Sequence, residues 1–188
     1  MSDVAMLHRQ ALDATRRIVA AVGEEQWGDP TPCGEWDVRG LVNHIVTGNY
    51  WAGELASGKT IADVGDRLDG DVLGTDPLHV YDKSADIAAE AFSRPGAMEA
   101  PCAVSYGPVP GSVYAGHRFI DVLVHGWDVA AATGQSTSLD PELVTACIEV
   151  LEPQFDALKA SGEFGAAIKP PSGANPETKL LAMLGRTG

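Results

Sequence analysis

The sequence of 188 residues has few of the features that mark several common classes of protein. Its three cysteines, Cys33, Cys102 and Cys147, lack the number and spacing of a disulfide framework or a zinc knuckle. We therefore expect reduced thiols and a cytoplasmic protein. No apolar run approaches the length of about 20 residues that spans a bilayer, and the first residues lack the basic and apolar regions of a signal peptide. We expect no association with a membrane.

Positive charge is also scarce, with 13 Lys and Arg against 26 Asp and Glu and a formal net charge of -13. Such a chain repels phosphate backbones, so we expect no binding to nucleic acid. The sequence contains neither of the glycine-rich loops that bind dinucleotides or nucleotide phosphates, and it contains no internal repeat. Its length favours a single domain over residues 1–188.

Apolar residues recur at steps of three and four over most of the chain, which is typical of helices. Four long helices are predicted, over residues 3–22, 37–57, 76–93 and 112–133. A fifth should begin at Asp140-Pro141 with a kink at Pro153, and a short one should end at Gly185. Residues 59–75 are expected to be a loop, and residues 97–111 an extended excursion with a hairpin around Tyr106-Gly107. The prediction is an all-α four-helix bundle with that excursion before its fourth helix and a short C-terminal helix.

Residues 116–128 of the fourth predicted helix are apolar over most of its circumference, and the polar residues at positions 117, 121, 125 and 128 lie on one side of it. A solvated helical face is one interpretation, but this stripe has no Lys, Glu or Gln. Asp121 and His125 are one turn apart, a spacing that lets both side chains bind one metal ion. His117 is excluded from the same ion, because its Cα lies about 12 Å from that of His125 along the axis.

A third ligand has to come from another helix, and His44 is the candidate at an apolar border of the second helix. A structural histidine bonded to a backbone carbonyl is the alternative there. Two histidines and one carboxylate with open positions suit a catalytic Zn²⁺, Ni²⁺ or Fe²⁺ site. Asp128 could hold the second nitrogen of the His125 ring or be a surface carboxylate. Arg118 could meet an anionic substrate group or lie on the surface.

The remaining candidates are set aside at this point. We expect His8 and His79, each in the first turn of a helix, to lie on the surface. Cys33 falls in a proline-rich loop and is not assigned to the metal ligands.

Two motifs resemble a known family. Thr31-Pro32-Cys33-Gly34-Glu35-Trp36-Asp37-Val38-Arg39-Gly40-Leu41-Val42-Asn43-His44 is similar to the opening of the second helix in the DinB/YfiT-like metal-binding superfamily. It looks closest to the branch that contains the metal-binding domain of mycothiol-dependent maleylpyruvate isomerases. Asp121-Val122-Leu123-Val124-His125-Gly126-Trp127-Asp128 resembles the second metal motif of that branch. Phe164-Gly165 and Leu180-Leu181-Ala182-Met183-Leu184-Gly185-Arg186 resemble the tail of its short, single-domain members.

This resemblance implies a four-helix bundle with a divalent metal, Zn²⁺ before Ni²⁺ or Fe²⁺, held by residues matching His44, Asp121 and His125. It also implies a low-molecular-weight thiol such as mycothiol as a cofactor. Two departures are visible: the isomerases continue into a further domain near where this sequence ends, and Asp121 stands where they commonly have Glu.

The predicted function is that of a thiol-dependent transferase or isomerase acting on a small electrophile. One alternative is a non-catalytic metal- or thiol-binding protein, for which a homodimer is one form. Another is a ferrous iron oxygenase, because two histidines and one carboxylate also bind iron in such enzymes.

Overall fold

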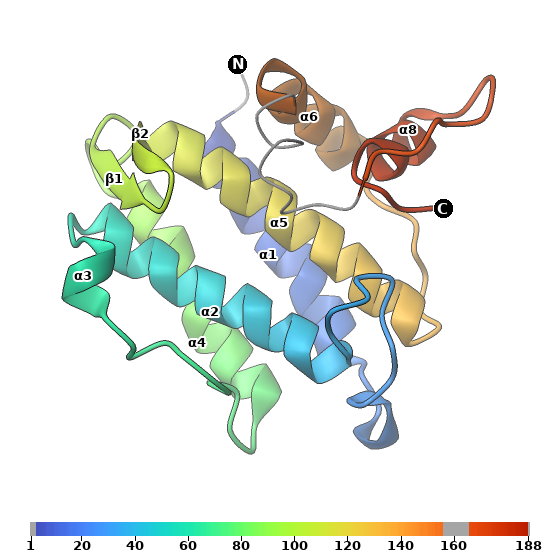
Figure 1. Cartoon of the computed structure of the whole chain (residues 1–188), viewed down its shortest axis with the longest axis horizontal. Coiled ribbons are helices and arrows are strands. Elements are labelled where there is room, and N and C mark those ends of the chain that lie inside the picture. The colour runs from blue at the N-terminus through green and yellow to red at the C-terminus, as the bar shows by residue number, and fades with distance from the viewer. Residues whose placement is uncertain (1–2, 156–165, 188) are drawn as a thin grey trace. The chain divides into compact units, whose positions relative to one another are not determined.

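The computed structural model describes residues 3–155 and 166–187, and its chain divides into two compact units, Met1–Gln135 and Ser136–Gly188. That these two units form the single domain expected over residues 1–188 stays a prediction. The first unit contains the helices α1 (Val4–Ala20), α2 (Val38–Ala56), α3 (Ile61–Val64), α4 (Pro77–Ser93) and α5 (Gly111–Ala132), the 3-10 helix η1 (Glu24–Gln26) and the strands β1 (Pro101–Val104) and β2 (Gly107–Pro110) (Figure 1). The predicted all-α fold is confirmed.

The long helices begin where the sequence places capping residues. The Asp3 carboxylate accepts hydrogen bonds from the first amides of α1, and Asp37 accepts one from Gly40 N at 2.7 Å in α2. Asp76 caps α4, with Pro77 as its first residue. Each carboxylate satisfies an amide that has no partner within the helix, which explains why the boundaries could be predicted.

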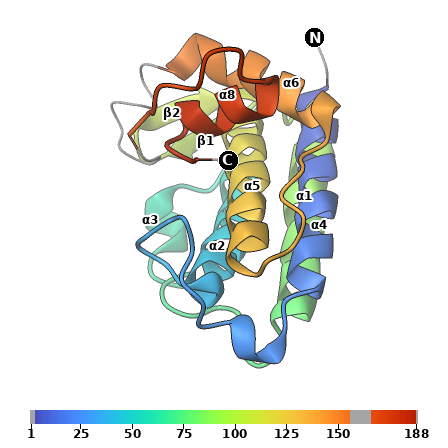
Figure 2. The same cartoon turned by 90° about the vertical axis from the view of Figure 1, so that its right-hand side faces the viewer.

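The bundle consists of α1, α2, α4 and α5, which run side by side (Figures 1 and 2). Helices α1 and α5 run in the same direction: Thr15 Oγ1 donates to the carbonyl of Val122 at 3.0 Å, and Gln135 beyond α5 donates to that of Ile18. Helices α2 and α4 run in the opposite direction (Figure 1). The segment that joins them is therefore a long crossover connection, as in other bundles with two parallel neighbours.

The crossover differs from its prediction, because it contains α3. Thr60 N donates to Asp63 Oδ2 at 2.8 Å, and Asp63 N donates to Thr60 Oγ1 at 3.2 Å, so the two residues cap this turn reciprocally. A helix of four residues is too short to show a periodic pattern.

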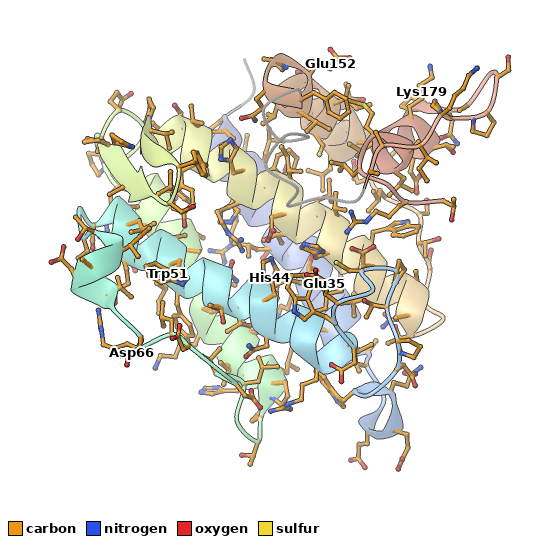
Figure 3. The ribbon with its side chains drawn as sticks, viewed as in Figure 1. Glu35, His44, Trp51, Asp66, Glu152 and Lys179 are labelled. Carbon is orange, nitrogen blue, oxygen red and sulfur yellow. The ribbon has the colours of Figure 1, made fainter. Side chains whose placement is uncertain are left out.

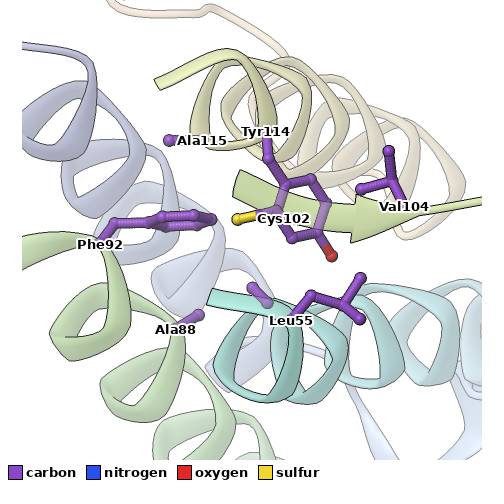
Figure 4. Close-up of a cluster of buried hydrophobic side chains, with 8 residues drawn as sticks. Leu55, Ala88, Phe92, Cys102, Val104, Tyr114 and Ala115 are labelled. Atoms are coloured by element: carbon purple, nitrogen blue, oxygen red, sulfur yellow. The ribbon is translucent and has the colours of Figure 1, made fainter. Parts of the chain in front are cut away.

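The predicted hairpin is confirmed. Strands β1 and β2 pair antiparallel, with Cys102 opposite Val109, and Gly107 adopts a positive φ of 115° at the turn. A cluster of buried side chains fixes the hairpin to the ends of α2 and α4 and to the start of α5 (Figure 4). Its members are Ala52, Leu55, Ala88, Phe92, Cys102, Val104, Tyr114 and Ala115.

The second unit contains α6 (Pro141–Leu151), η2 (Glu152–Gln154) and α8 (Pro176–Met183). Both predicted C-terminal helices are present. Instead of a kink within one helix, α6 ends before the 3-10 turn that contains Pro153, which cannot donate the next helical hydrogen bond. Phe164-Gly165 lie outside the described residues. Within residues 3–155 and 166–187, no helix is both long enough and apolar enough to cross a membrane.

Candidate metal centre

Close packing against α1 sets the orientation of α5. A Cβ atom on Gly126 would lie 2.3 Å from Thr15 Oγ1, so only glycine permits this approach of the two helices. Thr15 also bonds the backbone of α5 one turn earlier, at Val122. With this side of α5 held against α1, Asp121 and His125 face α2, where His44 lies in the middle of the helix.

The three predicted ligands converge in the structure. His44 Nε2 lies 3.1 Å from Asp121 Oδ1, and His125 Nε2 lies 3.5 Å from the same oxygen. The two imidazole rings are nearly perpendicular, with centroids 5.1 Å apart. His44 is the most exposed of the three side chains at 34%, while His125 is 3% exposed. Figure 3 shows His44 on α2, near Glu35 of the loop that precedes this helix.

These distances fit a metal ion. The donor atoms of His44, Asp121 and His125 all lie within 4.8 Å of one another. Two ligands of one tetrahedral ion, with bonds of about 2.0–2.1 Å, are themselves about 3.3 Å apart. The separations of 3.1 and 3.5 Å bracket this value. Asp121 and either histidine could therefore bind an ion with little movement of their side chains.

Asp128 is fully buried, so it is not a surface carboxylate. Its Oδ2 lies 3.0 Å from Nδ1 of His125. An imidazole that donates its Nδ1–H to a carboxylate has its Nε2 lone pair directed at the opposite side of the ring. Here that side is where Asp121 and His44 lie.

Arg118 is also buried, with a side-chain exposure of 8%, so the surface interpretation is wrong for it. Its Nη1 donates to Asp121 Oδ2 at 2.7 Å, and its Nη2 donates to Ile45 O and Asn49 Oδ1, both at 3.2 Å. The guanidinium thus binds one carboxylate oxygen of Asp121 and leaves the other facing the histidines. Gly48 provides the space, because a Cβ atom there would lie 2.3 Å from Nη1.

The charges around Asp121 keep it ionised. Burial alone would raise the pKa of this carboxyl group, but Arg118, His44 and His125 outweigh that effect and hold the pKa well below its ordinary value. Asp121 is therefore a carboxylate at neutral pH.

Two residues of the loop before α2 reach the centre, and sequence reasoning missed both. The Trp36 ring stacks on His44, with centroids 4.6 Å apart, and its edge-to-face contact with His125 spans 6.0 Å. The Cys33 thiol lies with a ring nitrogen of His125 and a carboxylate oxygen of Asp128, all within 4.8 Å of one another. Their place in the sequence motif that ends at His44 was the feature from which their proximity to the site could have been predicted.

His117 and His8 have different surroundings. His117 bonds Tyr106 through Nδ1 and does not belong to the cluster of His44, Asp121 and His125, in line with its predicted exclusion. His8 was expected on the surface, but it is fully buried, with its ring edge-on to Phe92. Burial, together with Arg118, lowers the pKa of His8 to about 3. Its apolar surroundings come from across the bundle, which the pattern of α1 alone could not reveal.

The fold and the site define the class of protein: a helical bundle in which two imidazoles and a carboxylate converge between two antiparallel helices. The family model of the mycothiol maleylpyruvate isomerase N-terminal domain matches residues 8–130. The chain belongs to this family, as the resemblance of its two motifs predicted.

Known proteins similar to the chain include two curated relatives and one solved structure. The relatives are uncharacterized proteins from two strains of Mycobacterium tuberculosis, each 40% identical over 98% of both chains. The crystal structure of the mycothiol-dependent maleylpyruvate isomerase superposes with a TM-score of 0.65 at 14% identity. The superposition covers 91% of this chain and 77% of the isomerase chain, so the two proteins share a fold.

Proposed function

We propose that the protein binds one divalent metal ion through His44, Asp121 and His125, and that it acts as a thiol-dependent transferase or isomerase on a small electrophile. The convergence of the three donor atoms within 4.8 Å of one another carries this proposal. Family membership supports mycothiol as the thiol, because the family is named for an isomerase that uses it. We place the reaction in the cytoplasm, as the cysteine pattern predicts.

Zn²⁺ is the first choice of metal, because two imidazoles and one carboxylate leave a tetrahedral position open. Ni²⁺ and Fe²⁺ accept the same ligands. When bound, the metal supplies a Lewis acid that favours the thiolate form of a coordinated thiol.

The residues around the ligands keep them in place. Asp128 accepts the Nδ1 proton of His125, so that Nε2 is available as a ligand. Arg118 orients Asp121 and maintains its charge. The Trp36 ring covers one face of His44 and restricts rotation of that imidazole.

A matched set of alanine variants tests the ligands. His44→Ala and His125→Ala should each lose most of the bound metal in elemental analysis of the purified protein, while circular dichroism shows that the helices remain. His117→Ala is the control, since it removes an imidazole from the same stripe of α5 but not from the cluster. Loss of metal from His117→Ala with retention in His44→Ala would show that the ligand assignment is wrong.

Turnover separates the catalyst from a non-catalytic metal or thiol carrier. In the presence of mycothiol, the metal-loaded protein should convert an electrophile such as maleylpyruvate, and conversion should cease in His44→Ala. A transferase consumes the thiol, whereas an isomerase regenerates it. Metal binding without any conversion of the electrophile would favour the carrier. Oxygen uptake with Fe²⁺ and a 2-oxo acid would instead favour an oxygenase, which the same donor set permits.

A further inference from the structure

His125 stands between two groups of donor atoms that differ in chemistry. On one side are the nitrogen of His44 and the oxygen of Asp121, and the other group consists of the sulfur of Cys33 and the oxygen of Asp128. We propose that Cys33, His125 and Asp128 form a second metal position, selective for a thiophilic divalent ion such as Zn²⁺, Co²⁺ or Cd²⁺. The two positions share His125, so this one is tested in protein that lacks His44 and Asp121, where the outcome does not depend on the function proposed above.

The backbone of the loop holds the Cys33 side chain in this location. The Thr31 hydroxyl donates to the carbonyl of Cys33 at 3.0 Å and to that of Trp36 at 2.7 Å, and it accepts from Cys33 N at 3.2 Å. Trp36 N also donates to the Cys33 carbonyl at 3.0 Å. The turn is thus closed by four hydrogen bonds of the Thr31 hydroxyl and the backbone of Cys33 and Trp36. The position of the sulfur near His125 follows from an ordered loop.

Burial and charge favour a cation at this point. Asp128 and His125 are buried, whereas Cys33 is only half-buried, so an ion would enter from the side of the thiol. A carboxylate and a thiolate taken out of water are stabilised when they bind a metal ion together. His125 Nδ1 and Asp128 Oδ2 are already 3.0 Å apart, so binding requires mainly that the Cys33 sulfur, within 4.8 Å of the other two donor atoms, moves closer by up to about one ångström.

Sulfur determines which ions should bind. A thiolate ligand favours Zn²⁺, Co²⁺ and Cd²⁺ over Mg²⁺ or Ca²⁺, which prefer oxygen. Both donor sets require His125, and an ion held by Cys33 and Asp128 takes the place of the proton that His125 Nδ1 shares with Asp128. The two positions therefore compete for this imidazole.

Cobalt spectroscopy with the full-length protein tests this site directly. Co²⁺ alone, without added thiol, is titrated into the double variant His44→Ala/Asp121→Asn, which lacks the first donor set. We expect one Co²⁺ per chain and a charge-transfer band from thiolate to cobalt. Adding Cys33→Ser to the double variant should abolish the band, whereas Cys102→Ser should retain it, because Cys102 is buried under the hairpin. Circular dichroism confirms that each variant is folded.

A second readout does not depend on the colour of cobalt. In the double variant, Co²⁺ should slow alkylation of Cys33 by iodoacetamide by about 10-fold or more, because a coordinated thiolate is a poor nucleophile. Two results would each overturn the proposal: no charge-transfer band in the double variant, or a band that survives Cys33→Ser. Failure of the first metal site gives a different result, because wild type and the double variant would then bind Co²⁺ with the same affinity.

Discussion

The substitution Gly48→Ala should separate the role of Arg118 from that of the ligands themselves. It changes no residue of the metal centre, yet the new Cβ atom would lie 2.3 Å from Arg118 Nη1 and 2.4 Å from its Cζ. Ordinary contact begins at 3.4 Å, so the guanidinium has to move by about 1.1 Å. Such a shift breaks its 2.7 Å hydrogen bond to Asp121 or its bonds to Ile45 and Asn49.

The size of the effect follows from these contacts. A hydrogen bond to a charged group contributes roughly 1.5–3 kcal/mol, and alanine in a helix regains about 1 kcal/mol over glycine. For the loss of one such bond we expect the free energy of unfolding to fall by about 0.5–2 kcal/mol. Release of the Asp121 carboxylate should weaken metal binding about 10–100-fold, as other outer contacts of metal ligands do.

Gly53→Ala is the matched control. It lies on the same helix, and its Cβ atom would meet Ile87 Cγ2 at 2.5 Å, an apolar contact away from the site. Urea unfolding and competition with a chromophoric chelator should show lost stability in both variants but weaker metal binding only in Gly48→Ala. Equal metal affinity in the two variants would refute the role given to Arg118.

Three further results are expected. His8 is neutral in the folded protein because its pKa is about 3, below the ordinary value of 6.5, so acid favours the unfolded state. In chemical unfolding between about pH 7 and pH 5, the stability of wild type should therefore fall by about 2 kcal/mol more than that of His8→Gln, and equal losses would contradict the burial. Tyr81→Phe should reduce stability by about 1–2 kcal/mol, because the Tyr81 hydroxyl donates to the buried carbonyl of Leu12 at 2.9 Å; an unchanged urea midpoint would argue against that bond. After denaturation all three cysteines should titrate as thiols, whereas in the folded, metal-free protein only Cys33 should react, because the other two are fully buried. An intramolecular disulfide would count against a cytoplasmic location.

Local chemistry accounts for the parts of the fold that could be predicted. A helix begins where a side chain can satisfy its first amides, and Asp37 and Asp76 do so within three residues of themselves. The pairing of Asp121 with His125 is equally local, because their spacing of four residues sets their separation on any helix. The short helix α3 was not predicted, because four residues are too few to show the helical period of apolar residues.

What surrounds the ligands is not local. Nothing near Arg118 in the sequence indicates that Gly48, 70 residues earlier, leaves space for its guanidinium. The burial of His8 depends on Phe92 and on α5, and the approach of Cys33 to His125 depends on the turn closed by Thr31.

The sequence by itself therefore determined the helices, their ends and the candidate ligands, because hydrogen bonds between near neighbours and the helical period govern these features. Only the tertiary structure decided which polar groups are buried and which possible metal-ligand atoms lie close together. Burial and convergence depend on partners far apart in the chain, which come together when the helices pack.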